Sequence, residues 1–276
     1  AAVAKIYAAK RRPPFNPLIA HVENRSAAET QGMFTREAGA LAEAFWPGPL
    51  TLVLPLAPGA TVCALARAGL ASVALRVPAH SVAQNLLAAT GLPLAAPSAN
   101  LSGRVSSVTA AHVCEDLDGR IDAMIDAGGA IVGIESTIVS CLGAQPQLLR
   151  PGGIPRAAIE AVLDRPLAAP AGADTPRAPG MLASHYAPRA RLRLNATSLE
   201  EGEAGLDFGG KFGEATDVLD LSPRRDLIEA AANLFGYLRA LDGERHPTIA
   251  VAPIPATGLG EAINDRLRRA AGGREN

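Results

Sequence analysis

The chain begins with a basic segment that could hold phosphate groups. Lys10, Arg11 and Arg12 follow one another, and residues 1–22 contain no Asp or Glu. Prolines on both sides of Asn16 restrict the backbone and could fix the direction of its amide. Because Arg donates forked hydrogen bonds and Lys supplies a compact positive charge, the segment suits a polyphosphate. A solvated basic helix end, favoured by the helix dipole, explains the same charges.

Arg76 is a candidate partner for a carboxylate. In residues 72–77, large apolar residues alternate with Ser72, Ala74 and Arg76, which predicts a strand with two different faces. A guanidinium on the inner face of such a strand needs a partner. Both a carboxylate ligand and a structural Asp or Glu would meet that need. Ser72 shares the face of Arg76 and is a second candidate.

Small and hydroxyl-bearing residues follow the strand predicted at 94–96. Ser98 and Asn100 lie in a run of small residues, and Ser106 follows shortly after. Small residues let a ligand approach the backbone, and ligands of α/β sheets bind beyond the carboxyl ends of strands. A polar turn with a side-chain cap is the alternative interpretation. Ser98 is not expected to act as a nucleophile, because it does not lie in a GxSxG segment.

Three more polar residues interrupt apolar runs. His21 and Ser136 lie inside such runs, and Arg150 ends another before a Pro-Gly-Gly turn. Buried polar groups need partners, so each of the three indicates either a ligand or a neighbouring loop. The sequence has no HxxxH spacing or His/Cys cluster that would predict a zinc site, and neither GxxxxGK[ST] nor GxGxxG occurs.

Predicted strands and helices alternate along the chain. Strands are predicted over 18–22, 51–56, 72–77, 94–96, 121–125, 131–140, 147–150, 190–194, 216–220 and 248–252. Helices are predicted over 1–10, 35–46, 81–89, 155–164, 224–241 and 260–271. This close alternation indicates an α/β or α+β fold. Residues 165–180 are rich in Ala and Pro, and we interpret them as a linker.

Composition limits the class of protein. Hydrophobic residues make up 48% of the chain, which suffices for a packed core, and the formal net charge of −1 does not indicate a dedicated nucleic-acid binder. We find no apolar run long enough to span a membrane and no signal peptide. Cys63, Cys114 and Cys141 show no CxxC spacing and are predicted to be buried thiols in a reducing compartment.

Taken together, six segments resemble the YrdC-type threonylcarbamoyl-AMP synthase family, in the order and spacing of that family. These segments are AKRRPPFNPLIAHV, FWPGPLTLVL, VALRVPAH, LAAPSANLSGRVSSVTAAHV, GIESTIVS and LLRPGGI. The later segments APGMLASHYAP and GLGEAINDRLRRAA are similar to those of the two-domain form of the family. Six ordered motifs make the resemblance far more specific than any single one.

The resemblance implies a fold and an activity. The fold is α/β, with a twisted mixed-sheet YrdC-like catalytic domain over 1–165, a linker over 166–189 and a small Rossmann-like C-terminal domain over 190–276. The activity is the formation of threonylcarbamoyl-AMP and pyrophosphate from L-threonine, bicarbonate or CO2, and ATP, for tRNA modification. The expected location is the cytoplasm, without membrane contact. A threonylcarbamoyl transferase would take the product, and a weak tRNA contact is a further option.

The resemblance also implies site residues. Lys10 and Arg12 would be catalytic. The residues expected to bind ATP are Lys10, Arg12, Asn16, Ser72, Ser98, Asn100, Ser106, Arg150, His185 and Tyr186. The residues expected to bind threonine are His21, Arg76, Ala96 and Ser136. No protein side chain is expected to ligate a metal, and Mg2+ would be held mainly by ATP phosphates and water.

One departure from the family pattern stands out, and two other functions remain as hypotheses. The family normally begins with a Pro-Thr-Glu-Thr-like strand and a Tyr-Gly-Leu-Gly turn, and neither occurs here. We therefore expect part of the threonine pocket and a strand to be absent from this chain. The main alternative is a non-catalytic module that binds double-stranded RNA or tRNA. A carbamoyl-adenylate step of hydrogenase maturation is a third hypothesis, disfavoured because no acylphosphatase or zinc-finger region is present.

Overall fold

The computed structural model describes residues 2–168, 185–213, 215–243 and 245–272. They form two compact units. The described part of the first comprises residues 2–97 and 135–168, and that of the second comprises 98–134 and the described residues from 185 onward. Packing thus groups residues 98–134 with the C-terminal part of the chain. The division into 1–165, 166–189 and 190–276 stays a prediction, and most of the expected linker lies outside the described residues.

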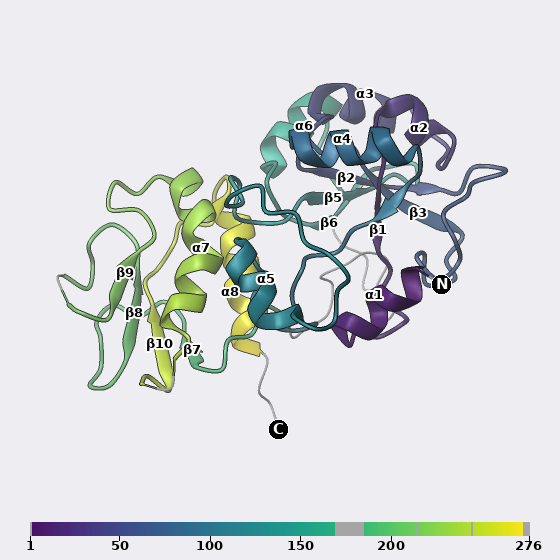
Figure 1. The fold of residues 1–276 in the computed structure, drawn as a ribbon. Coiled ribbons are helices and arrows are strands. Elements are labelled where there is room, and N and C mark those ends of the chain that lie inside the picture. Colours follow the sequence, from purple (N-terminus) through teal and green to yellow (C-terminus); the bar gives the residue numbers. More distant parts are fainter. Residues whose placement is uncertain (1, 169–184, 214, 244, 273–276) are drawn as a thin grey trace. The chain divides into compact units, whose positions relative to one another are not determined.

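A six-stranded mixed sheet forms the centre of the first unit (Figure 1). Its strands are β1 (Ile19–His21), β2 (Leu50–Pro55), β3 (Ser72–Arg76), β4 (Leu94–Ala95), β5 (Thr137–Ser140) and β6 (Gln147–Arg150). Their order is β4-β1-β3-β2-β5-β6. β1 pairs with β3, and β2 with β5, in parallel; the other pairs are antiparallel. The expected mixed sheet is confirmed.

Helices cover one face of this sheet. The helices of the first unit are α1 (Ala2–Lys10), α2 (Arg25–Glu29), α3 (Arg36–Phe45), α4 (Ser81–Thr90) and α6 (Arg156–Leu163). Figure 1 shows α2, α3, α4 and α6 on the same side of the strands. α3 begins where the Thr35 side chain accepts a hydrogen bond from the Ala38 amide, and its buried Leu41 packs in one cluster with Leu52 of β2. The larger apolar cluster of the unit therefore lies between these helices and the sheet. Burying each leucine there contributes roughly 1.5–3 kcal/mol to the stability of the fold.

A four-stranded parallel sheet forms the centre of the second unit. Its strands are β7 (Arg191–Arg193), β8 (Ala204–Asp207), β9 (Val218–Asp220) and β10 (Thr248–Val251), in the order β7-β10-β8-β9. Its helices are α5 (Ala110–Leu117), α7 (Leu227–Leu241) and α8 (Gly260–Ala271). Every strand pair is parallel, as expected for a Rossmann-like domain whose connections cross over through helices.

Residues 98–134 are built onto the core of the second unit. Val105 and Ile134 are buried in the same apolar cluster as residues of α7 and α8. Gly133 has a φ of 73° and lies so close to α7 that a Cβ atom there would overlap the backbone of Ala231 and Ala232. Only glycine permits this approach without strain. The segment is therefore an integral part of the C-terminal core.

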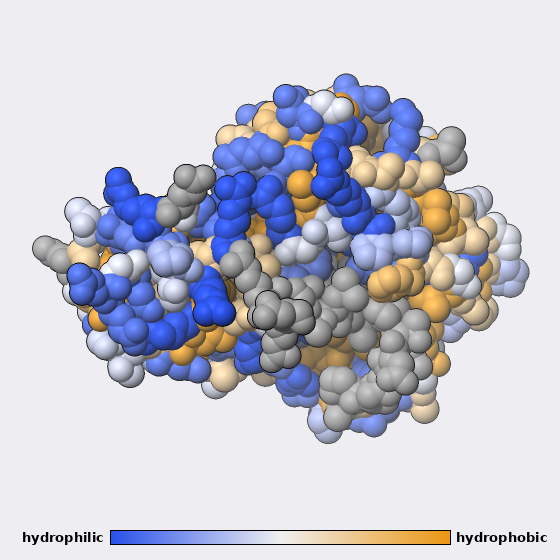
Figure 2. Space-filling model, turned by 90° about the horizontal axis from the view of Figure 1, so that it is seen from below, coloured by the Kyte–Doolittle hydropathy of each residue, from blue (hydrophilic) through white to orange (hydrophobic). Residues whose placement is uncertain are grey.

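Several sequence predictions differ from the structure. The strand predicted at 121–125 is wrong, and the one at 131–140 is restricted to β5, because residues 118–132 are exposed and pair with no described strand. Ile125 is 65% exposed and Ile131 84% exposed. Apolar residues of this kind remain among the polar ones on the molecular surface, as the mixed colours of the face in Figure 2 illustrate. The helices α2 and α5 and the strand β8 were not predicted.

The structure can be compared with the predictions about the cysteines and about membrane-spanning segments. Cys141 is buried, and burial raises the pKa of its thiol to about 12. The prediction of buried thiols is wrong for Cys63 and Cys114, which are exposed; all three are free thiols. Among the described residues, every helix is too short or too polar to cross a lipid bilayer.

Candidate functional site

The sheet of the first unit has a second face, which carries the polar candidates. Ile19, Val53, Ala74 and Ile138 form a small apolar cluster that contains no helix residue. Residues two apart in a strand share a face. Five polar residues lie two positions from a member of this cluster: His21, Thr51, Ser72, Arg76 and Ser136. Four of them are predicted site residues, so the structure brings these four to one face of one sheet.

Arg76 lies at the end of β3 with an unusual environment for a guanidinium. Its Nε donates to the carbonyl oxygen of Gly48 at 2.9 Å. Within the described residues, its two Nη groups have no hydrogen-bond partner, and no Asp or Glu forms an ion pair with it. Burial, followed by the charge of Arg150, lowers the pKa of Arg76 to about 10. A half-buried fork without a counter-ion suits a carboxylate or phosphate ligand.

His21 lies beside Arg76. The two residues are paired in the register of β1 and β3. The Nδ1 atom of His21 is buried and has no hydrogen-bond partner among the described residues. Burial, and then the charge of Arg76, lower the pKa of His21 to about 3. The imidazole is therefore neutral at pH 7 and offers one donor and one acceptor.

Ser136 belongs to a buried polar network. Its hydroxyl lies 2.7 Å from the hydroxyl of Thr51, on the neighbouring strand β2. Arg150 donates from Nε and Nη2 to the Ser136 carbonyl oxygen at 3.1 and 2.9 Å, and from Nη2 to its hydroxyl at 3.2 Å. A Cβ atom at Gly152 would overlap the backbone of residues 135–137. The tight turn after β6 thereby holds Ser136 in place.

Arg12 and Asn16 form a second cluster, before β1 begins. Nη2 of Arg12 donates to Oδ1 of Asn16 at 2.7 Å and to the carbonyl oxygen of Pro17 at 2.9 Å. The Tyr7 hydroxyl donates to the carbonyl oxygen of Asn16 at 3.1 Å. The Asn16 side chain is fully buried, and its Nδ2 has no partner among the described residues. Lys10, the last residue of α1, is also buried. Arg12 thus fixes the orientation of the Asn16 amide and leaves its Nδ2 without a partner among the described residues.

Ser72 and Ala96 lie at the other end of these strands from Arg76 and His21. Ser72 begins β3, whereas Arg76 ends it. Ala96 is exposed, and its amide donates to the carbonyl oxygen of Ile19 at 3.1 Å. The structure therefore separates Ala96 from His21 by the length of β1. Their roles toward a ligand stay predictions.

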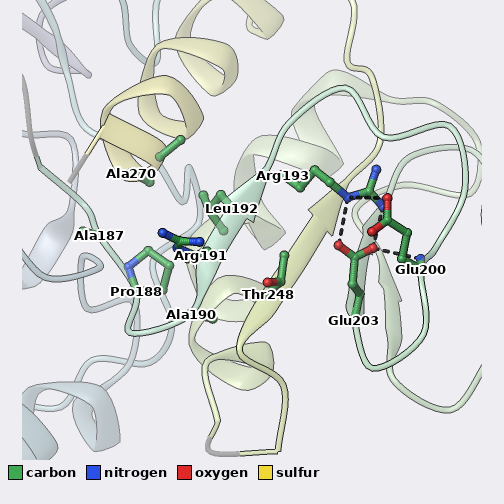
Figure 3. Close-up of a pocket in the computed structure, with 11 residues that line it drawn as sticks. Ala187, Pro188, Ala190, Arg191, Leu192, Arg193, Glu200, Glu203, Thr248 and Ala270 are labelled. Atoms are coloured by element: carbon green, nitrogen blue, oxygen red, sulfur yellow. Dashed lines mark hydrogen bonds and ion pairs between the residues drawn. The ribbon is translucent and has the colours of Figure 1, made fainter. Parts of the chain in front are cut away.

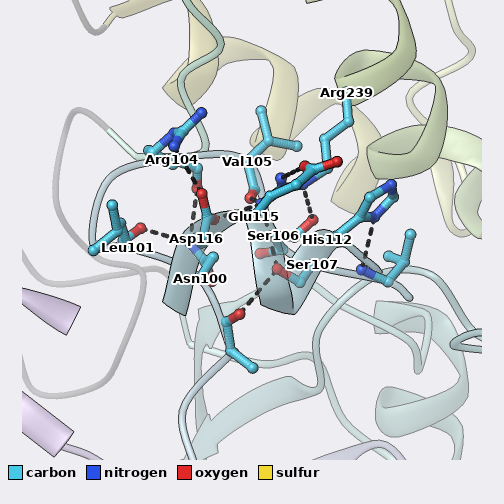
Figure 4. A network of polar contacts seen from close by, with 12 residues as sticks. Asn100, Leu101, Arg104, Val105, Ser106, Ser107, His112, Glu115, Asp116 and Arg239 are labelled. Atoms are coloured by element: carbon cyan, nitrogen blue, oxygen red, sulfur yellow. Dashed lines mark hydrogen bonds and ion pairs between the residues drawn. The ribbon is translucent and has the colours of Figure 1, made fainter. Parts of the chain in front are cut away.

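The remaining predicted residues belong to the second unit. Asn100 and Ser106 are buried, and Ser98 is half-buried. Nδ2 of Asn100 donates to the carbonyl oxygens of Leu101 at 2.8 Å and Arg104 at 3.0 Å, and Figure 4 shows these residues around one loop. The Asn100 amide therefore shapes the loop that carries Ser98 and Ser106.

His185 and Tyr186 lie in the core of the second unit. The ring of Tyr186 is 1% exposed, stacks on Phe235 at 5.4 Å and faces the Arg266 guanidinium at 5.3 Å. His185 contacts Tyr186 edge to face at 4.1 Å. These contacts fasten the last part of the expected linker to the C-terminal core. The suggestion that either residue reaches a nucleotide stays a prediction.

A cavity of about 470 Å³ lies beside β7 in the second unit, and none of the predicted site residues lines it (Figure 3). Two of its charged residues pair with each other, since Nε of Arg193 donates to Oε1 of Glu203 at 2.8 Å. This bond, the largest cause, lowers the pKa of Glu203. The pair joins β7 to the segment that precedes β8.

The described residues contain no group of three or more His, Cys, Asp or Glu side chains that could hold a metal ion. Mg2+ prefers octahedral oxygen ligands and is commonly held by substrate phosphates, water and one or two carboxylates.

Sequence reasoning missed three residues of these networks. Thr51 could have been found, because it is a polar residue at the start of an apolar strand and alternates with Val53. Asp116 and Arg239 form a buried ion pair across 123 positions. Nothing in the local sequence of either residue indicates the other.

Comparisons with known proteins agree with this architecture. The family model Sua5_yciO_yrdC, described as "Telomere recombination", matches residues 1–152. The model Sua5_C, described as "Threonylcarbamoyl-AMP synthase, C-terminal domain", matches residues 154–272. The threonylcarbamoyl-AMP synthase of Bacillus subtilis is 42% identical and spans 99% of this chain and 84% of its own length. The synthase of Pyrococcus abyssi is 39% identical over 98% of this chain and 84% of its own length.

Solved structures show the same fold. The crystal structure of Pyrococcus abyssi Sua5 complexed with L-threonine has a TM-score of 0.90 and 37% sequence identity, covering 99% of this chain and 85% of its own. A variant of the same protein has a TM-score of 0.89 and 36% identity, covering 99% of this chain and 84% of its own.

Proposed function

Because the chain belongs to the threonylcarbamoyl-AMP synthase family, we propose that it forms threonylcarbamoyl-AMP and pyrophosphate from L-threonine, bicarbonate or CO2, and ATP. The observation that carries the proposal is the Arg76 fork. It lies half-buried on the sheet face opposite α2, α3, α4 and α6, has no acidic partner among the described residues, and keeps both Nη groups available. A buried cation of this kind is costly unless an anion joins it.

L-Threonine is the proposed anion at Arg76. Its carboxylate would accept two parallel hydrogen bonds from the Nη groups, a geometry that guanidinium favours. His21, neutral and with an unpartnered Nδ1, would hydrogen-bond the amine or hydroxyl of threonine. Ser136 lies on the same face and would line the pocket. The relative from Pyrococcus abyssi that was solved with L-threonine supports this choice of ligand.

ATP is the proposed ligand of the basic cluster and of several hydroxyl groups. Lys10 and Arg12 would neutralise phosphate charge, and Nδ2 of Asn16 would donate to a phosphate oxygen. The other residues assigned to the nucleotide are Ser72, Ser98, Asn100, Ser106, Arg150, His185 and Tyr186. Asn16 lies five positions before His21, at most about 17 Å away along the chain, so the two can hold different parts of the reacting pair.

The reaction would proceed in two steps. The neutral amine of threonine adds to CO2, forms a carbamate and releases a proton; with bicarbonate, water is lost. A carbamate oxygen then attacks the α-phosphorus of ATP, the bond to the β-phosphate bridging oxygen breaks, and pyrophosphate leaves. Such phosphoryl chemistry depends on positioning and charge neutralisation more than on a covalent nucleophile. Arg76 would fix the threonine end, and Lys10 and Arg12 would stabilise the departing charge.

Mg2+ would enter with ATP. The described residues form no carboxylate or histidine cage for the ion. Phosphate oxygens and water would therefore be its main ligands.

In the cell, the product would pass to a threonylcarbamoyl transferase that modifies tRNA. Threonylcarbamoyl-AMP is a mixed anhydride and is reactive toward amines, so an acceptor must follow. A cytoplasmic location is consistent with three free thiols, two of them exposed. Any contact with tRNA itself would be weak, because the net charge of −1 offers little attraction to phosphate backbones.

Pyrophosphate release tests the proposal. The protein is incubated with ATP, Mg2+, bicarbonate and L-threonine, and both pyrophosphate and the product mass are measured. We expect equal amounts of pyrophosphate and threonylcarbamoyl-AMP, both dependent on threonine. L-Serine and D-threonine are matched controls for the pocket. Folded protein that binds RNA in a salt-sensitive manner but releases no threonine-dependent pyrophosphate would favour the non-catalytic alternative instead.

A further inference from the structure

We propose that the C-terminal domain holds the nucleotide loop in its working shape, and that Arg239 on α7 is the positioning residue. The loop is residues 98–108, which carry Ser98, Asn100 and Ser106. The inference rests on the proposed function, since that function assigns the loop to ATP. All residues involved belong to the second compact unit.

Arg239 is bound to the backbone of this loop. Its Nη2 donates to the carbonyl oxygen of Val105 at 2.7 Å, and its Nε donates to that of Ser106 at 3.3 Å. Nη2 also lies 3.3 Å from the hydroxyl of Ser107. Figure 4 shows the Arg239 side chain extending from α7 toward these three residues. One guanidinium therefore fixes three consecutive loop residues.

Asp116 fixes the guanidinium in turn. The Asp116 side chain is fully buried, and its Oδ2 lies 2.7 Å from Nη2 of Arg239. Its Oδ1 accepts from Nη1 of Arg104 at 2.7 Å. Arg104 belongs to the loop, and Asp116 to α5. The carboxylate thus joins two arginines, one from the loop and one from the C-terminal domain. Buried charges with several partners have few alternative geometries.

The loop itself completes the arrangement from within. The Asn100 amide donates to the carbonyl oxygens of Leu101 and Arg104, and the Ser107 hydroxyl donates to that of Ala99 at 2.9 Å. The amide of Ala187, near the end of the expected linker, donates to the carbonyl oxygen of Gly103 at 2.8 Å. The loop therefore has contacts to both the start of the C-terminal region and α7.

Apolar packing adds to the hydrogen bonds between the loop and α7. Val105 is buried in the cluster that contains Leu234 and Phe235 of α7. Val108 packs against the same cluster. Because this segment lies within the first family match and α7 within the second, the contact joins the two homologous regions. A loop supported in this way is preorganised, and binding then costs less ordering entropy.

Substitution of Arg239 tests the inference. Arg239→Ala removes the hydrogen bonds of the guanidinium to Val105, Ser106 and Ser107 but leaves Asp116 paired with Arg104. We expect the Kd of a non-hydrolysable ATP analogue and the KM for ATP to rise at least about tenfold, while the KM for L-threonine changes less than about twofold. Amide hydrogen exchange in residues 98–108 should become faster. Arg245→Ala is the matched control, because Arg245 is an exposed arginine of the same unit.

Arg239→Lys keeps the test valid if the alanine variant does not fold. Lysine retains the charge opposite Asp116 but cannot reach two carbonyl groups with a planar fork. We expect an intermediate rise in the Kd for the ATP analogue. Folded variants with the wild-type Kd and the wild-type exchange rates in residues 98–108 would overturn the inference. Failure of the proposed function differs from this result, because the wild-type protein would then show no threonine-dependent use of ATP.

Discussion

His21 and Arg76 lie directly opposite each other on the neighbouring parallel strands β1 and β3. Both point to the sheet face that carries only a small apolar cluster, and Arg76 contributes to the low pKa of His21. A neutral imidazole beside an unpaired guanidinium can distinguish the two ends of an amino acid. The carboxylate is attracted to the charge, and the uncharged ring accepts or donates a hydrogen bond.

Arg76→Ala should weaken threonine binding. Hydrogen bonds to charged groups contribute about 1.5–3 kcal/mol, so the Kd and KM for L-threonine should rise at least about tenfold. For Arg76→Lys, the Kd for L-threonine should lie between those of the wild type and Arg76→Ala, because lysine keeps the charge but loses the two parallel donors. Calorimetric titration with threonine and initial-rate measurements check this. Arg36→Ala, which removes an exposed arginine of the same unit, should have no effect. Unchanged threonine affinity in a folded Arg76→Ala variant would reject the threonine pocket.

Asn16→Asp should weaken ATP binding without unfolding the protein. The new carboxylate still accepts from Arg12, as Oδ1 does at 2.7 Å in the present structure. The substitution replaces the unpartnered Nδ2 donor by an oxygen that repels phosphate. We expect the Kd of an ATP analogue to rise at least about tenfold and that of threonine to stay unchanged. If the affinity for ATP is retained, the Asn16 amide does not face the phosphates.

The free energy of unfolding should fall as the pH drops below about 6.5. The pKa of His21 is about 3 in the folded protein and 6.5 for the ordinary group. Between these values the unfolded chain binds a proton that the folded protein does not, so the stabilisation decreases by up to about 1.4 kcal/mol per pH unit. Urea unfolding at a series of pH values measures this slope. His21→Gln should flatten it, and an equally steep slope in that variant would contradict the assignment to His21.

Gly152→Ala should destabilise the protein and displace Ser136. A Cβ atom there would overlap the backbone of residues 135–137. Overpacking of this kind typically costs about 1–3 kcal/mol. Gly143→Ala, in the connection between β5 and β6, is the control, because no atom lies within 4 Å of its added Cβ. Thermal unfolding compares the two. Equal melting temperatures would show that the turn adjusts without strain.

Removal of Mg2+ should stop pyrophosphate release reversibly. Since the described residues offer no metal cage, chelation should leave the melting temperature of the free protein unchanged. Addition of Mg2+ should restore the activity in proportion to the concentration of the Mg–ATP complex. A chelator that lowers the melting temperature without nucleotide would instead indicate a structural metal bound by the protein.

Hydrophobic patterns within single segments correctly predicted several strands of the first unit. The alternation in β3 placed Ser72 and Arg76 on one face, and the apolar run of β2 gave a buried strand. The prediction failed at 121–125, where Ile121, Met124 and Ile125 are apolar but no described strand lies beside them. A strand needs a neighbour, and the sequence of one segment does not contain that information.

Long-range contacts explain what the sequence could not predict. The ion pair of Asp116 and Arg239 spans 123 positions. Both Asp and Arg are ordinary surface residues in a sequence, and only tertiary packing reveals that these two are buried.

A crystal structure of the protein with bound L-threonine tests the central claim most directly. We predict that the threonine carboxylate lies within about 3.2 Å of both Nη groups of Arg76, with His21 beside the amine or hydroxyl. The ligand should occupy the sheet face opposite α2, α3, α4 and α6. A carboxylate bound elsewhere, with the Nη groups of Arg76 still without a partner, would contradict the account.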